Sequence, residues 1–114
     1  MSSQDTLKYA ESEEQSAKNL QSQIDSLLAK NAALQKDMGG DNDAALQKDI
    51  DSNNDLIAGY QQKVQQHTND AQRLRQQAVE EQKQEQEELL HEQEKGKDSL
   101  AKNAAQEIVR NSFF

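Results

Sequence analysis

Two runs of apolar residues at alternating steps of three and four constrain the fold of this chain more than any other feature. The first run covers residues 6–38 and the second covers residues 46–78. Such alternation is typical of helices in a coiled coil, because it keeps one apolar seam turned toward the partner helix. The residues that we assign to the coiled-coil seam are Leu20, Ile24, Leu27, Asn31, Leu34, Met38, Leu46, Ile50, Asn53, Ile57, Tyr60, Val64 and Leu74.

The two runs are out of phase, which predicts a break between them. Met38 and Ile50 occupy the same heptad position but lie 12 residues apart, so one uninterrupted helix cannot keep both on one seam. Between them stand two glycines that suit a helix end, followed by residues that suit the cap of a second helix. We therefore predict helices over residues 1–38 and 44–78, and a turn over residues 39–43 that includes Gly39, Gly40, Asp41 and Asn42.

Folding the chain about Asn42 aligns the two seams. Opposed residue numbers then add up to 84, and each layer pairs the two seam positions as an antiparallel coiled coil requires; Leu34, for example, meets Ile50. The same alignment places Asn31 opposite Asn53, the only two asparagines on the seam. A buried Asn pair can bond across the seam, and a slipped register would leave both amides unsatisfied. The alternative is that two of eight asparagines align by chance, but we predict an antiparallel coiled-coil hairpin in this register.

Composition supports an all-α fold with a thin core. The 114 residues include no proline, and the abundant Gln, Glu, Ala, Lys and Leu are good helix formers. Aromatic residues are limited to two Tyr and two Phe, and the formal net charge is −8. Burial of so few large side chains offsets only part of the entropy lost on ordering the hairpin. Because Leu28 and Leu56 widen its apolar face, we expect the hairpin to join a larger helical bundle or assembly, through self-association or a partner protein.

Beyond residue 78 the sequence divides into two further segments. Residues 79–96 hold seven Glu and a single Lys between 80 and 94, which predicts a long, solvated acidic helix; a frayed linker is the alternative. Gly96 is the first helix breaker after the hairpin, so residues 97–114 are predicted to form a separate, short amphipathic C-terminal helix. Its apolar stripe is a candidate partner-binding surface, formed by Leu100, Ala104, Ile108, Val109, Phe113 and Phe114.

The sequence predicts no catalytic, metal-binding or cofactor-binding site. Glu88 and His91 form one Glu-x-x-His pattern, but di-iron bundles use two copies and two further Glu, and the surrounding segment is too polar to bury a metal. The chain has no cysteine, no phosphate-binding glycine loop and no nucleophile beside a suitable base. His67 lies on the seam opposite Ala17, where we expect a tolerated core residue; a pH switch is the alternative. We therefore expect a protein that is not an enzyme.

Charge and hydropathy narrow the choice of partner and compartment. The acidic balance argues against binding nucleic acid through phosphates. No apolar stretch approaches the roughly 20 residues of a membrane span, and the N-terminus does not resemble a signal peptide, so a cytoplasmic or virion- or assembly-associated protein is expected. The predicted function is that of a coiled-coil subunit that oligomerises or scaffolds a filament, a virion or a secretion-type complex. The alternative is an adaptor or regulator that binds one partner through its C-terminal segment.

Overall fold

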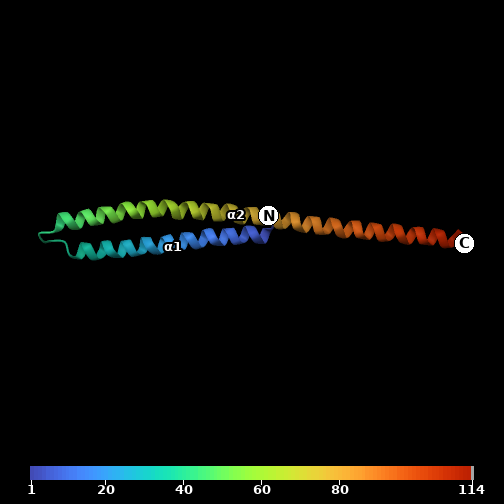
Figure 1. Ribbon diagram of the computed structural model, residues 1–114, viewed down its shortest axis with the longest axis horizontal. Coiled ribbons are helices and arrows are strands. Elements are labelled where there is room, and N and C mark those ends of the chain that lie inside the picture. Colours follow the sequence, from blue (N-terminus) through green and yellow to red (C-terminus); the bar gives the residue numbers. More distant parts are fainter. Residues whose placement is uncertain (114) are drawn as a thin grey trace.

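The computed structural model is all-helical over the residues it describes. The chain forms α1 (Ser3–Lys36) and α2 (Asp43–Phe113), and the described part contains no strand. Described are the backbone of residues 1–113 and the side chains of residues 1–97, 100, 102 and 103. The molecule is a thin rod that measures 111 × 15 × 13 Å (Figure 1). The prediction of an all-α chain is therefore confirmed.

Local capping explains where α1 begins and ends. The side chain of Ser2 accepts a hydrogen bond from the backbone N–H of Asp5 at 3.2 Å, which satisfies one of the free donors of the first turn. Asp5 in the first turn and Lys36 in the last turn both complement the helix dipole. The helix closes with the N–H of Asp37, which donates to the carbonyl of Leu34 at 3.1 Å.

The connection between the helices depends on glycine and on one aspartate. Gly39 has a φ of +113°, a conformation that favours a residue without Cβ. The carboxylate of Asp43 reaches back to accept hydrogen bonds from the N–H groups of Gly39 at 2.9 Å and Gly40 at 3.2 Å. The first backbone bond of α2 runs from the N–H of Leu46 to the carbonyl of Asn42 at 3.0 Å. The turn is thus held by the first residue of the helix that follows it.

The two helices lie side by side only over part of the length of α2. Figure 1 shows α2 turning back so that its first part runs beside α1, and the N-terminus lies near the middle of the rod. Ser3, the first residue of α1, contacts Glu85 of α2. We call residues 3–36 and 43–85 the paired section, and residues 86–113 of α2 the overhang.

The helix boundary expected at Gly96 is absent. α2 continues through Gly96 to Phe113, so the acidic segment and the C-terminal segment belong to one helix rather than two. A single glycine inside a helix costs only about 1 kcal/mol relative to alanine, and it keeps its backbone N–H. The neighbouring Glu and Lys residues are strong helix formers, and they outweigh this small penalty.

The buried residues form a narrow line between the helices. Ile24, Ile50 and Ile57 are buried in the half nearer the turn, whereas alanines at 10, 71 and 78 fill the other half. Each residue assigned to the seam is buried or half-buried, including Met38, which lies past the end of α1. By contrast, Leu28 and Leu56 remain 50% and 48% exposed. The core is therefore one side chain wide, and its flanks are open.

Candidate functional site

The most distinctive polar site of the paired section is a layer of three asparagines. Asn31 of α1 is only 7% exposed. Its side-chain oxygen accepts a hydrogen bond from the amide of Asn53 at 2.9 Å, and its own amide donates to the side-chain oxygen of Asn54 at 2.9 Å. The predicted contact between Asn31 and Asn53 is thus present, whereas the role of Asn54 was not foreseen. The buried side-chain amide of Asn31 is tolerated because both its oxygen and its nitrogen are hydrogen-bonded, and loss of Asn53 or Asn54 would leave one of these atoms without its partner.

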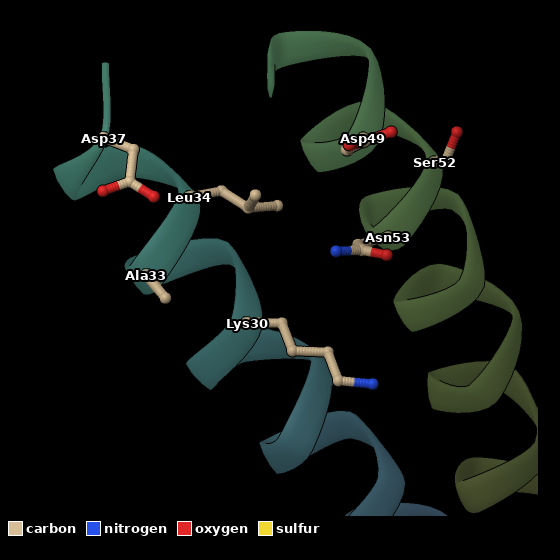
Figure 2. Close-up of a pocket in the computed structure, with 7 residues that line it drawn as sticks. All are labelled: Lys30, Ala33, Leu34, Asp37, Asp49, Ser52 and Asn53. Carbon is tan, nitrogen blue, oxygen red and sulfur yellow. The ribbon is translucent and has the colours of Figure 1, made fainter. Parts of the chain in front are cut away.

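A hollow of about 420 Å³ lies beside this layer on one flank of the rod. Figure 2 shows Leu34 of α1 and Asn53 of α2 pointing toward one another across it. Its lining combines Lys30, Ala33, Leu34 and Asp37 of α1 with Asp49, Ser52 and Asn53 of α2. The hollow is open to solvent and has charges of both signs on its lining, so it reflects the exposed side of a core that is one side chain wide.

Ionisable pairs join the helices further from the turn. Nδ1 of His67 contacts the carboxylate of Glu13, one turn away from the Ala17 expected opposite it. This contact becomes an ion pair only when His67 is protonated. On the outer edge, Arg75 donates from Nε to Glu14 at 3.1 Å and from a terminal nitrogen at 2.5 Å. This two-pronged hydrogen bond lowers the pKa of Glu14 and raises the pKa of Arg75 from their ordinary values.

The paired section ends in a polar cluster that sequence reasoning missed. The carboxylate of Glu85 accepts hydrogen bonds from the backbone N–H and the hydroxyl of Ser3, each at 2.9 Å. The hydroxyl of Thr6, which is fully buried, donates to the carboxylate of Glu81 at 2.5 Å. Glu85 thereby satisfies a free N–H at the positive end of the α1 dipole. We call these four residues the end clamp, because they mark where α1 stops and the overhang begins.

A sequence signal for the end clamp does exist. Continuing the steps of four and three from Leu74 through Ala78 leads to Glu81 and then Glu85. The run of apolar positions stops at Ala78 because the next positions are charged, and carboxylates seldom face a partner helix. Their burial is only partial, and hydroxyl groups stand opposite them, which is what makes the positions tolerable.

The predicted C-terminal binding surface lies mostly beyond the described side chains. Leu100 is described and is 71% exposed. Ala104, Ile108, Val109, Phe113 and Phe114 lie outside the described side chains. The structure therefore places the backbone of residues 100–113 on the overhang, away from the paired section.

A cluster of metal ligands and a membrane-spanning helix are both absent from the described part of the chain. Within it, no three His, Asp or Glu side chains gather to hold a metal ion. Among the described residues, no helix has a stretch apolar and long enough to cross a bilayer. Comparisons of the chain with protein-family models, with curated proteins and with solved structures give no match. Its function has to be argued from its own geometry.

Proposed function

We propose that this protein is a non-enzymatic structural or assembly component, an antiparallel coiled-coil hairpin that oligomerises or scaffolds a larger complex. The protein would supply a rod of defined length, with one helix projecting from its end. A long shape with a core one side chain wide suits a spacer or an assembly element, which acts through its surfaces.

The observation that carries this proposal is the asparagine layer around Asn31. Polar groups inside a coiled-coil seam reduce stability, and their best-established role is to select one register and one partner arrangement. Asn31 bonds to Asn53 and Asn54 together, so a shift of either helix by one heptad would separate them. A protein that must present its ends at a constant spacing benefits from such a layer.

The thin core supports association with further helices. Large apolar side chains remain about half exposed along the rod, at Leu28 and Leu56 in the paired section and at Leu89 and Leu90 on the overhang. Helices in bundles bury such flanking residues against a neighbour, and long helices without tertiary packing are marginal in water.

The test is to measure mass and helicity together. We expect the full chain to be strongly helical by circular dichroism and to sediment as a species larger than one chain at micromolar concentration. A stably folded monomer at all concentrations would contradict self-assembly. A truncation after Gly96 serves as the second arm, because it shortens the overhang and leaves the paired section intact.

An adaptor or regulator that binds one partner protein through residues 99–114 is the second candidate. It is favoured by the 71% exposure of Leu100 on the projecting helix. This role predicts that the pure chain forms no large assemblies or fibres, and that the truncation after Gly96 abolishes capture of the partner.

A further inference from the structure

The overhang is a long helix that nothing in the described chain covers. Residues 86–113 extend about 40 Å beyond the end clamp, at roughly 1.5 Å per residue. Figure 1 shows this stretch projecting beyond the paired section, without α1 beside it. Because isolated helices owe little of their stability to propensity alone, this length of helix calls for a packing partner.

Large apolar side chains follow one side of α2 from the last turns of the paired section into the overhang. Val79 and Leu90 are eleven residues apart, and so are Leu89 and Leu100. Eleven residues make about three turns of an α-helix, so each pair lies on nearly the same line along α2. All four are well exposed, with 58% for Leu89 and 59% for Leu90. We call these four residues the overhang stripe.

The overhang stripe lies partly beside and partly along the face that meets α1. Val79 and Leu90 are turned about 100–120° from the buried Ala78, whereas Leu89 is eleven residues beyond Ala78 and continues nearly the same line. A shallow hollow of about 300 Å³ lies on the stripe, lined by Gln86, Leu89, Leu90 and Gln93. The centre of this hollow is apolar and its edges are glutamines, so both leucines are accessible to a second helix.

Charge along the overhang changes sign near its middle. Residues 86–94, the acidic arm, carry four Glu and no Lys or Arg for a net charge of −4. Residues 95–110, the basic arm, carry three Lys and one Arg against one Asp and one Glu, for a net charge of +2. A helix with one acidic arm and one basic arm is complementary to itself when it is reversed.

We propose that the overhangs of two copies of this chain pair antiparallel, with the acidic arm of each against the basic arm of the other. A centre near Lys95 sets Leu90 of one copy opposite Leu100 of the other and buries both overhang stripes. The resulting dimer is two-fold symmetric, with the two paired sections pointing away from each other at opposite ends. This inference rests on the proposed assembly function and names its partner, a second copy, and its orientation.

A substitution pair with a matched control tests the apolar contact. The variant Leu89→Gln/Leu90→Gln removes the centre of the stripe, and Ala32→Gln/Ala45→Gln makes the same number of apolar-to-glutamine changes at exposed positions near the turn. By sedimentation equilibrium we expect the first variant to raise the dimer dissociation constant at least about 100-fold, since four leucines per dimer lose their burial. The control should keep the wild-type constant. Loss of association in the control alone would overturn the proposal.

Charge exchange tests the orientation. The variant Glu87→Lys/Glu88→Lys reverses charge on the acidic arm, and Lys97→Glu/Lys102→Glu does so on the basic arm; all four residues are exposed. Antiparallel pairing predicts that each variant alone dimerises more weakly and that an equal mixture restores a dimer of wild-type affinity. Parallel pairing predicts that the first variant alone dimerises more tightly, because its facing acidic arms repel less. That result would refute the proposed orientation.

The outcomes separate this inference from the broader function. If wild-type protein assembles and the Leu89→Gln/Leu90→Gln variant assembles equally well, the overhang is not the contact, while the assembly function stands. If the wild-type chain is a folded monomer that binds a different protein through the overhang, both proposals fail. Circular dichroism of each variant verifies that the paired section remains helical.

Discussion

Replacement of Asn31 by alanine tests the asparagine layer directly. The substitution removes two hydrogen bonds that join the helices, each measuring 2.9 Å. A hydrogen bond of this kind contributes about 0.5–1.5 kcal/mol net, so the expected loss in the free energy of unfolding is about 1–3 kcal/mol. Because Asn54 is exposed and Asn53 is half-buried, water replaces part of the loss, and we expect a value in the lower half of this range.

The assay is urea unfolding followed by circular dichroism at one fixed protein concentration, because association changes apparent stability. Asn19→Ala is a matched control: Asn19 is exposed and accepts a hydrogen bond only from Gln15 of its own helix in the described structure. This control should shift the free energy of unfolding by less than about 0.5 kcal/mol.

A double-mutant cycle isolates the contact between the two helices. Asn31→Ala, Asn53→Ala and the double variant should give a coupling energy of about 0.5–1.5 kcal/mol, the net contribution of one hydrogen bond. Asn31→Leu should not lower the free energy of unfolding as Asn31→Ala does, because an apolar residue at this seam position should match or exceed the wild-type stability. The same substitution should weaken the selection of one register. A coupling energy of zero, or an Asn31→Leu variant as unstable as Asn31→Ala, would refute the reasoning.

Three further predictions follow from the turn, the outer edge and the overhang. Gly39→Ala should cost about 1–2 kcal/mol of unfolding free energy in urea titrations, since φ is +113°, whereas Gly40→Ala should change little; equal effects would contradict the conformational argument. The hydrogen bond from Arg75 lowers the pKa of Glu14, so this pair stabilises the fold above the pKa of the unfolded carboxyl group and loses that contribution as pH falls through the lower folded pKa. In an NMR titration, Arg75→Gln should raise the pKa of Glu14 toward its ordinary value, and an unmoved pKa would exclude the contact in solution. Gly96→Ala should raise helical ellipticity and stabilise the overhang by about 0.5–1 kcal/mol, and a loss of ellipticity would mean that the glycine is required for a bend.

Much of the architecture could be predicted from the spacing of a few residues. The phase difference between Met38 and Ile50 required an interruption, and the glycines between them located it within two residues. The alignment of Asn31 with Asn53 followed from the same arithmetic, and the hydrogen bond between them has the predicted partners. Periodicity succeeds here because a helix places its side chains at fixed angles, so that spacing alone decides which residues share a face.

The spacing of residues does not determine which group the tip of a flexible polar side chain contacts. Asp43 turns back to the glycines of the turn instead of capping its own helix, and Asn54 completes the asparagine layer from outside the predicted seam. Glu81 and Glu85 face α1 although their charge argued against it. Each of these depends on a partner in a distant part of the chain.

The sequence by itself determined two helices, the place of the turn and the line of residues between them, because heptad spacing and glycine act locally. Only the tertiary structure decided how far the pairing extends, and the structure was also needed to show that α2 continues as one helix past Gly96. The physical reason is that both depend on small competing terms. A carboxylate at the end clamp gains hydrogen bonds as it loses water, and a mid-helix glycine costs only about 1 kcal/mol, so packing and neighbouring residues settle the outcome.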